Sequence, residues 1–469
     1  MKEVVFLLLC FATFNSRAQN LSSKLASAVT ALEKDKQFEH AIVGMYVVET
    51  ATGNIVFERN AQTGLAPASC QKVVTSAGAF ELLGKDFHYK TLIGCDDLLK
   101  EGNMRGNLFF VGSGDPTLGS WRWKQTSVEN VLKKITASLR KNGVDKISGN
   151  IYSDDLRFSY NPVPDGWIWQ DIGNYYGAGA WAFNWRENQY DLALASTNTI
   201  GERTIIVSTD PPGIGDDITN LVRSAKKGSG DNVYLYAAPY NHEIFASGTI
   251  PVGENKFIVA GSLPNPLGTF LTAVSAAIKK EGIDFTGSLF TFSNALKNNS
   301  PLPKMTTILD SIISPSLDSI NFWFLKKSVN LYGEAFVKTI ASQKTTAGST
   351  DSGVAVIRNF WKTKGIDPAS LKILDGSGLS PANRVTTNAL VSVLQYAKKQ
   401  PWFSSFYYAL PEMNGIKMKD GYIGGVRSYT GYVKSKDGKE YTFSFIVNNF
   451  DGSPGTVREK MWKVLDLLK

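Results

Sequence analysis

Cysteine and histidine are scarce in this chain of 469 residues, which holds three of each. The histidines, His40, His88 and His242, stand far apart and form no HExxH pattern, and the cysteines form no CxxC pair. These absences argue against a zinc site and against a disulfide scaffold. No GxSxG turn is present either, which disfavours a Ser-His-Asp hydrolase. We therefore expect no metal and no cofactor, and a base other than histidine for any serine nucleophile.

Long apolar runs are also absent, because no stretch approaches the roughly 20 apolar residues that a membrane-spanning helix needs. The apolar run Val4–Phe14 follows Lys2 and precedes the small residues Ser16 and Ala18. This order is typical of a secretory signal peptide, which we place at residues 1–18. The sequence thus predicts a protein that is secreted across the inner membrane into the periplasm and has no membrane span.

Acidic residues are outnumbered, and the formal net charge is +8. Removal of the signal peptide takes away Lys2, Glu3 and Arg17 and leaves the chain basic. Outside the cytoplasm such a chain favours cell-wall polymers and anionic lipid headgroups over nucleic acid. Hydrophobic residues make up 43% of the chain, enough for a full core in two or three domains.

The order of strand and helix patterns predicts an α+β chain of several domains. The segments "AIVGMYVVET" and "GNIVFER" alternate around a turn and predict a strand pair. A helix is expected after Pro67, a mainly β region from about residue 93 to 305, and mostly helices from Thr306 to about Ala341. The late strands "GGVRSYTGYVKS" and "EYTFSFIVNNF" could join the first pair in one antiparallel sheet, before a last helix at "TVREKMWKVLDLLK".

These patterns suggest a domain plan with a nested insertion. The predicted parts are a signal peptide over 1–18, a catalytic domain over 19–92 and 306–469, an inserted domain over 93–184 and 262–305, and a β-rich subdomain over 185–261.

A serine and a lysine three residues apart stand at the start of the helix in "LAPASCQKVVTSAGAF". Helical spacing puts Ser69 and Lys72 on one face. A lysine whose amine is desolvated can act as the base for a serine hydroxyl. The spacing alone is weak evidence, because Ser138 and Ser224 also stand three places before a lysine.

Two further short patterns follow in order along the chain. The first is Ser328-Val-Asn330 in "LKKSVNLYGEAF", and the second is Lys419-Asp420-Gly421 in "IKMKDGYIGGVRS", which leads into a strand. Each occurs readily by chance. The order matters more: a serine at a helix start, then Ser-x-Asn among helices, then Lys-x-Gly at a strand.

In this order the chain resembles the penicillin-binding proteins. The segments "PASCQK", "KKSVNLYGE" and "LDGSGLSPANRVT", with "GNLFFVGSGDPTL" and "GWIWQDIGNYY", are similar to the low-molecular-mass class C group, the D-alanyl-D-alanine carboxypeptidase/endopeptidases of penicillin-binding protein 4 type. The resemblance covers nearly all of the chain after the signal peptide. It implies a serine β-lactamase/transpeptidase-like domain, an antiparallel sheet flanked by helices, with a large, mainly β insertion between the first and second motifs.

The resemblance also implies a serine-type acyl transfer on peptidoglycan stem peptides and covalent inhibition by β-lactams. Ser69 would attack the penultimate D-Ala carbonyl with Lys72 as base, and Ser328 would relay a proton to the leaving amine. Asn330 would bind a substrate amide and Lys419 would supply positive potential. The substrate-binding residues implied are Asp420, Gly421, Tyr422, whose backbone N–H would join that of Ser69 in an oxyanion hole, and Asp154, which would recognise the diaminopimelate amine.

Three departures from the family pattern concern the pocket for the substrate carboxylate. Asp420 stands where Thr or Ser is usual, Pro381 stands where an Arg often follows "GLS", and the connection from Pro411 to Lys419 is short. The rival interpretation is a catalytically impaired peptidoglycan-binding homologue on the same fold, and a β-lactamase is a lesser one. The sequence leaves open the oligomeric state, the preferred stem peptide, and the balance of carboxypeptidase and endopeptidase activity.

Overall fold

The computed structural model describes residues 21–97, 102–345 and 348–469, so the signal peptide predicted over 1–18 lies outside the described residues. Within these ranges no helix has both the length and the apolar character that crossing a membrane requires. The chain divides into two compact units. Unit 1 holds the described residues up to Leu82, Asn321–Ser328 and Val354–Lys469, and unit 2 holds Leu83–Ile320 and Val329–Gly353. The predicted domain boundaries differ from this division and stay a prediction.

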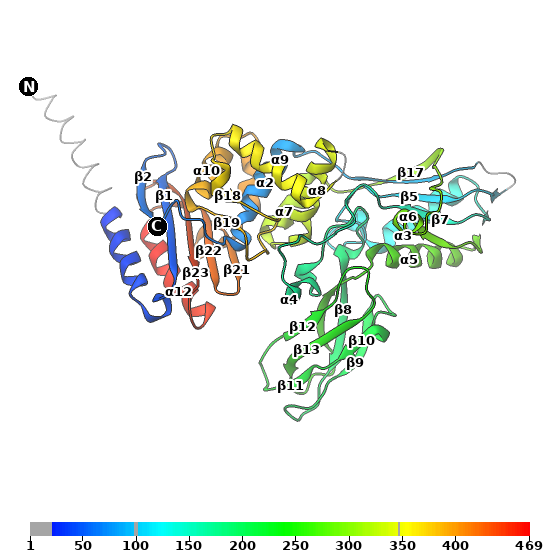
Figure 1. Cartoon of the computed structure of the whole chain (residues 1–469), viewed down its shortest axis with the longest axis horizontal. Helices are drawn as coiled ribbons and strands as arrows, with labels where there is room; N and C mark the ends of the chain where they lie inside the picture. Colours follow the sequence, from blue (N-terminus) through cyan, green and yellow to red (C-terminus); the bar gives the residue numbers. More distant parts are fainter. Residues whose placement is uncertain (1–20, 98–101, 346–347) are drawn as a thin grey trace, which may run out of the picture. The chain divides into compact units, whose positions relative to one another are not determined.

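Unit 1 contains a six-stranded sheet in the order β2-β1-β23-β22-β21-β20, with every neighbouring pair antiparallel. The predicted sheet that joins the first strand pair to the late strands is therefore confirmed (Figure 1). Its strands are β1 (Ile42–Glu49), β2 (Ile55–Arg59), β20 (Glu412–Met413), β21 (Ile416–Ile423), β22 (Val426–Lys434) and β23 (Glu440–Asn448).

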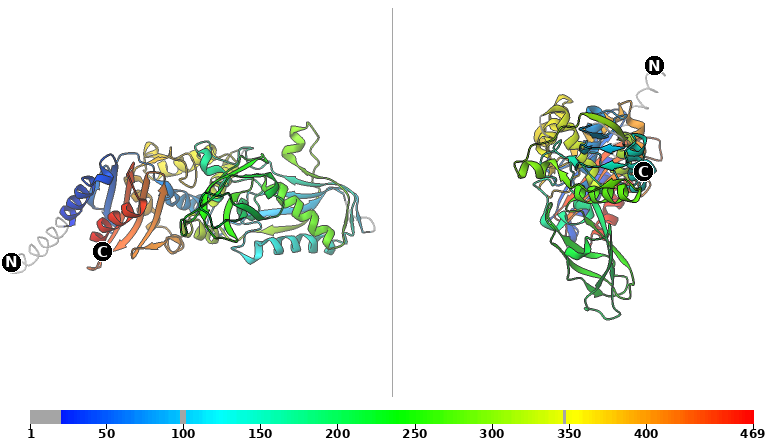
Figure 2. Two further views of the ribbon diagram at one scale, coloured as in Figure 1. Left: turned by 90° about the horizontal axis from the view of Figure 1, so that it is seen from below. Right: turned by 90° about the vertical axis from the view of Figure 1, so that its right-hand side faces the viewer.

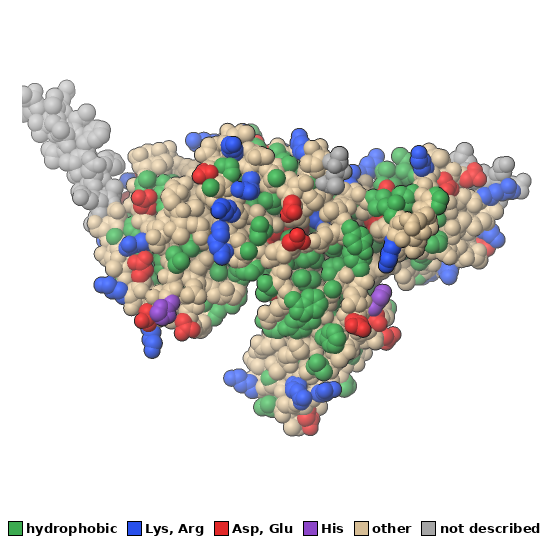
Figure 3. Space-filling model, in the orientation of Figure 1, with side chains coloured by type: hydrophobic (Ala, Val, Ile, Leu, Met, Phe, Trp, Pro, Cys, Tyr) green, Lys and Arg blue, Asp and Glu red, His purple; other side chains and the backbone are tan. Residues whose placement is uncertain are grey.

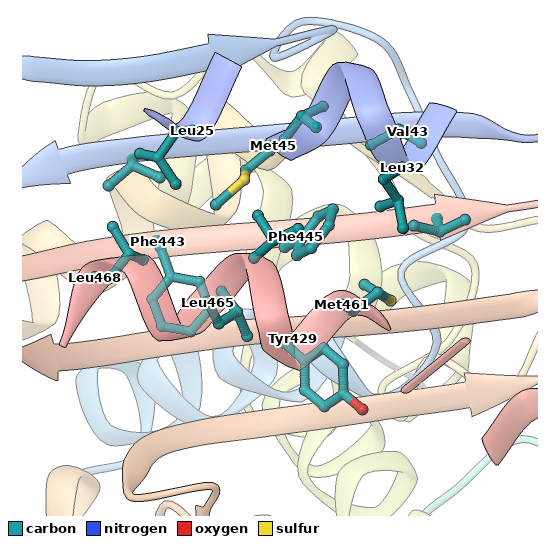
Figure 4. Close-up of a cluster of buried hydrophobic side chains, with 14 of the residues drawn as sticks. Leu25, Leu32, Val43, Met45, Tyr429, Phe443, Phe445, Met461, Leu465 and Leu468 are labelled. Carbon is teal, nitrogen blue, oxygen red and sulfur yellow. The ribbon is translucent and has the colours of Figure 1, made fainter. Parts of the chain in front are cut away.

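Helices cover both faces of this sheet. A helix over residues 21–33 and α12 (Pro454–Leu465) pack on one face, where Leu25, Phe443, Phe445 and Met461 share one buried cluster (Figure 4). On the other face α10 (Thr387–Lys398) contacts β1, β22, β23 and α2 (Lys72–Leu82). Because both faces are covered, β23 is buried along nearly its whole length.

Unit 1 also contains shorter elements, and it shares two helices with unit 2. They are η1 (Lys36–Phe38), η2 (Ala68–Gln71), η7 (Pro368–Ser370), β18 (Leu371–Lys372), β19 (Arg384–Val385), α11 (Phe403–Ala409) and η8 (Asp466–Leu468), with α7 (Leu317–Lys326) and α9 (Thr350–Thr363) shared.

Unit 2 is built on a mixed sheet in the order β16-β7-β5-β3-β17, with α3 and α5 packed in the same apolar core. The left view of Figure 2, seen from below, shows these two helices beside the strands of this sheet. The elements are β3 (Lys90–Cys95), β4 (Asn103–Met104), β5 (Leu108–Val111), η3 (Lys124–Thr126), α3 (Val128–Lys141), β6 (Lys146–Ile147), β7 (Ile151–Asp154), α4 (Trp169–Ile172), η4 (Tyr175–Gly177), α5 (Pro266–Lys280), β15 (Asp284–Phe285), β16 (Leu289–Thr291), α6 (Phe292–Lys297), β17 (Thr307–Ile313) and α8 (Asn330–Lys344).

The β-rich segment predicted over residues 185–261 forms two small sheets around its own core. One sheet has the order β14-β8-β9, and in the other β10, β11 and β12 all pair with β13. The elements are η5 (Arg186–Asn188), β8 (Gln189–Ala195), β9 (Ile205–Asp210), η6 (Gly215–Asp217), β10 (Ile218–Asn220), β11 (Arg223–Ala225), β12 (Asn232–Tyr236), β13 (Ile244–Pro251) and β14 (Phe257–Ser262).

Lys and Arg side chains are dispersed over the face drawn in Figure 3 and do not gather in one patch.

The prediction that helices dominate from Thr306 onward was wrong at its start. The segment TILDSII, Thr307–Ile313, is strand β17 and pairs antiparallel with β3. Its Thr and Ile residues favour a strand, and its partner β3 is more than 200 residues away in sequence, so local periodicity did not reveal the pairing. Helix α3 was likewise not anticipated within the region expected to be mainly β.

A buried carboxylate ties α8 to the inserted region inside unit 2. The Glu187 side chain, fully buried, accepts hydrogen bonds from Ser120 Oγ (2.6 Å), Arg122 Nε (2.9 Å) and Tyr332 OH (2.6 Å). Tyr332 lies in the first turn of α8. The position of that turn, which begins at Asn330, therefore depends on this carboxylate.

We expect Glu187→Gln to lower the free energy of unfolding by about 3–5 kcal/mol, because it leaves the Arg122 guanidinium half-buried without its counter-ion. Chemical denaturation measures the change. The control is Asp210→Asn, which breaks the exposed Arg186–Asp210 pair and should cost about 1 kcal/mol or less. Equal losses in the two variants would contradict the role given to Glu187.

Candidate active site

Ser69 lies in the short helix η2, which leads directly into α2 at Lys72. Their spacing brings the two side chains together: Lys72 Nζ donates a hydrogen bond to Ser69 Oγ at 2.9 Å. Lys72 is fully buried, while Ser69 is half-buried. The amine also lies 5.7 Å from the ring centroid of Phe324 in α7. A serine hydroxyl thus meets a desolvated lysine amine, the arrangement that activates a serine without histidine.

A turn over residues 375–380 provides the second acceptor for this amine. Lys72 Nζ donates to the backbone carbonyl of Ser377 at 2.7 Å. On the same helix, the hydroxyl of Thr75 donates to the neighbouring carbonyl of Gly376 at 2.7 Å. Gly378 has φ +83°, and a Cβ built on it would lie 2.0 Å from the carbonyl oxygen of Ala68. The turn therefore packs directly against the segment that carries Ser69.

Strand β21 supplies the Lys-x-Gly pattern next to Ser69. A Cβ built on Gly421 would lie 2.8 Å from the Ser69 backbone nitrogen and 2.3 Å from Ser428 Oγ. Only glycine leaves room for this approach of strand and helix start. The next residue, Tyr422, is half exposed.

Lys419 and Asp420 form an ion pair with each other. Lys419 Nζ lies 3.0 Å from Asp420 Oδ1 and donates to the Asp420 backbone carbonyl at 2.8 Å. Arg427 Nη2 lies 3.8 Å from Asp420 Oδ2. Burial by itself would raise the pKa of the Asp420 carboxyl, but the charges of Lys419 and Arg427 outweigh it and hold that pKa below its ordinary value. Asp420 is therefore a carboxylate at neutral pH.

Cys70 sits beside the nucleophile but has a structural environment. It is fully buried, and its thiol donates to the Lys419 carbonyl at 3.2 Å. Burial raises the pKa of the Cys70 thiol to about 12, which makes it unreactive. Cys70 is not disulfide-bonded.

The residues of the Ser-x-Asn pattern fall in different units. Ser328 ends the unit 1 segment Asn321–Ser328 and has φ +57°, a left-handed conformation that serine rarely adopts. Asn330 begins α8 in unit 2, where its Nδ2 donates to the carbonyl of Tyr176 at 2.8 Å. The unusual backbone at Ser328 turns the chain between α7 and α8.

Asp154 ends strand β7, where its carboxylate accepts from the Leu156 backbone N–H at 3.0 Å. A different carboxylate, that of Asp171, is linked to Asn330 through Tyr176. Tyr176, whose carbonyl accepts from Asn330, has its hydroxyl 3.3 Å from Asp171 Oδ1. Burial raises the pKa of the Asp171 carboxyl, and the hydrogen bond from Tyr176 opposes that shift.

The sequence analysis did not single out Ser377, whose carbonyl accepts a hydrogen bond from Lys72, or Asp171, which accepts one from Tyr176. The available signals were "LDGSGLS", whose glycines and serines predict a tight turn, and "WQDIGNYY", which places a carboxylate among aromatic residues. The competing Ser138 lies on α3, where its side chain is buried. Among the described residues, no group of three or more His, Cys, Asp or Glu side chains is placed to hold a metal ion.

Comparison with known proteins covers almost the whole chain. Residues 25–467 match the sequence profile of the D-Ala-D-Ala carboxypeptidase 3 (S13) family. A D-alanyl-D-alanine carboxypeptidase of Actinomadura sp. is 28% identical over 92% of this chain and 82% of its own length. The crystal structure of penicillin binding protein 4 from Haemophilus influenzae superposes with a TM-score of 0.78 at 21% identity, covering 96% of this chain and 99% of that one. A second structure of that protein, complexed with a β-lactam, has a TM-score of 0.74 at 19% identity, with coverage of 95% and 99%.

Proposed function

Because the chain belongs to the D-Ala-D-Ala carboxypeptidase 3 (S13) family, we propose that it cleaves peptidoglycan stem peptides through an acyl-enzyme on Ser69. The reaction is D-Ala-D-Ala carboxypeptidase or cross-link endopeptidase chemistry, with β-lactams as covalent inhibitors. The observation that carries the proposal is the buried Lys72 amine at 2.9 Å from Ser69 Oγ. No comparison favours the rival interpretation as an impaired binding homologue.

In acylation, Lys72 Nζ in its neutral form takes the proton of Ser69, and Ser69 Oγ attacks the carbonyl of the penultimate D-Ala. Gly421 has no side chain, so β21 can lie beside the Ser69 backbone N–H, and this N–H with that of Tyr422 would hold the oxyanion. Ser328 would pass a proton to the leaving amine and Asn330 would bind a substrate amide. Water then releases the acyl group from Ser69.

The secretion signal predicted over 1–18 supports a periplasmic location for this chemistry, where peptidoglycan would be within reach of the enzyme. The amide bonds that Ser69 would attack lie in the peptides of that polymer. A basic mature chain is also compatible with a wall that carries carboxylates.

We expect Ser69→Ala to abolish both the release of D-Ala from a pentapeptide ending in D-Ala-D-Ala and the labelling by a fluorescent penicillin. Lys72→Ala should lower the labelling rate by roughly 10²- to 10⁴-fold, the usual worth of a positioned base. Ser138→Ala is the matched control, since it also precedes a lysine by three residues and should label as wild type. Undiminished labelling of Ser69→Ala would rule out Ser69 as the nucleophile.

We further propose that Asp420 selects against substrates with a free carboxylate next to the scissile amide. Two carboxylates roughly 4 Å apart repel by about 4 kcal/mol at an effective dielectric constant of 20. The Lys419 ammonium already pairs with Asp420, so it offers a second carboxylate less positive potential than an unpaired lysine would. Substrates in which that carboxylate is masked, as in an amidated peptide, avoid the repulsion.

Asp420→Thr should raise kcat/KM for a pentapeptide with a free C-terminal carboxylate much more than for the same peptide amidated at its C-terminus. The removal of the negative charge frees Lys419 to attract the carboxylate. Asp420→Asn, which keeps the shape of the side chain, should shift the ratio in the same direction. Equal changes for the two peptides would show that Asp420 does not sense the carboxylate.

Two carboxylates in unit 2 are candidates for binding the side-chain amine of the stem peptide's diamino acid. The family resemblance assigns it to Asp154, whereas the hydrogen bonds that link Asn330, Tyr176 and Asp171 favour Asp171. A half-buried carboxylate linked through Tyr176 to the amide-binding Asn330 would attract an ammonium.

Asp171→Asn is expected to raise KM by about tenfold, equivalent to 1.4 kcal/mol, for a stem peptide whose side-chain amine is free. The same variant should leave KM unchanged for the same peptide when its side-chain amine is acetylated. Asp154→Asn is the matched variant. A larger rise in KM for Asp154→Asn than for Asp171→Asn would show that Asp154 binds the amine.

A further inference from the structure

A carboxylate without exposure to solvent organises the turn that contacts Lys72. Asp375 Oδ1 accepts from the Gly378 backbone N–H (2.8 Å), Asn383 Nδ2 (3.0 Å) and Gln71 Nε2 (2.9 Å). Asp375 Oδ2 accepts from the Ser380 backbone N–H at 2.7 Å. Asp375 is fully buried, so these hydrogen bonds replace its hydration. The carboxylate therefore fixes both ends of the turn over 375–380.

We propose that Asp375 is a positioning residue for acyl transfer, which acts by holding the Ser377 carbonyl where it orients the Lys72 amine toward Ser69. A neutral amine has two N–H bonds and one lone pair. One N–H donates to the Ser377 carbonyl at 2.7 Å, and this bond restricts rotation of the amine. The lone pair can then face Ser69 Oγ, 2.9 Å away, and take its proton as the Oγ–H bond breaks.

The turn over 375–380 also contacts η2, the short helix that carries Ser69. Gln71, which lies between Ser69 and Lys72 in sequence, donates through Nε2 to both the carboxylate and the backbone carbonyl of Asp375, the latter at 2.6 Å. Gly378 packs on the carbonyl of Ala68. Asp375 thus bonds both to Gln71, which lies between Ser69 and Lys72 in the chain, and to the turn that carries the Ser377 carbonyl, so a shift of the carboxylate changes the geometry of the pair without touching substrate.

This inference rests on the proposed function, and its test separates acylation from binding. With a chromogenic β-lactam, wild-type protein gives a dissociation constant for the non-covalent complex and a rate constant for acylation. Asp375→Asn keeps the size of the side chain but places an NH₂ group against an N–H donor. We expect the acylation rate constant to fall by roughly ten- to a hundredfold, within the worth of general-base catalysis. The dissociation constant should change little.

The matched control is Thr75→Val, which removes the hydrogen bond to the Gly376 carbonyl of the same turn but leaves the Ser377 carbonyl on Lys72. It should lower thermal stability yet keep the acylation rate constant close to that of wild type. If Asp375→Asn does not fold, Gln71→Met removes two donors to Asp375 and should show a smaller loss in the same rate constant.

The outcomes distinguish two failures. Absence of acylation in wild-type protein would refute the proposed function itself. If wild type is acylated and both Asp375→Asn and Gln71→Met react at the wild-type rate, or if Thr75→Val loses as much as they do, Asp375 has no positioning role.

Discussion

The site depends on the burial of one amine. Lys72 has no exposed surface, and its Nζ lies between the hydroxyl of Ser69 and the carbonyl of Ser377. A lysine in water is an ammonium and cannot accept a proton, so the protein must desolvate this group to use it as a base. Two backbone segments distant in sequence, the helix start at Ser69 and the turn over 375–380, are needed to enclose it.

The six-stranded sheet of unit 1 provides the rigid frame for this enclosure. Its central strands are buried on both faces, which excludes water and fixes their register. Strand β21 runs past the start of the helix so closely that Gly421 admits no side chain beside the Ser69 nitrogen. Glycine is therefore required at this position by two close approaches, one to the Ser69 nitrogen and one to Ser428 Oγ on the neighbouring strand β22.

Much of the frame could be predicted from sequence, since alternating strands and a serine-lysine pair at a helix start are local signals. The hairpin of β1 and β2, the late strands and the last helix were all found in this way. Strand β17, the carbonyl of Ser377 and the pairing of Lys419 with Asp420 were not, because each depends on contacts between segments or on side-chain orientation. The pattern "LDGSGLS" predicts a turn, but only the fold shows that the turn faces Lys72.

Peptide mapping of the penicillin adduct shows directly whether Ser69 forms an acyl-enzyme. Purified protein is incubated with penicillin G, digested and analysed by tandem mass spectrometry. We expect one penicilloyl group, carried by Ser69 in the peptide that contains "PASCQK". A protein that stays unmodified, or an adduct on any other residue, would contradict it.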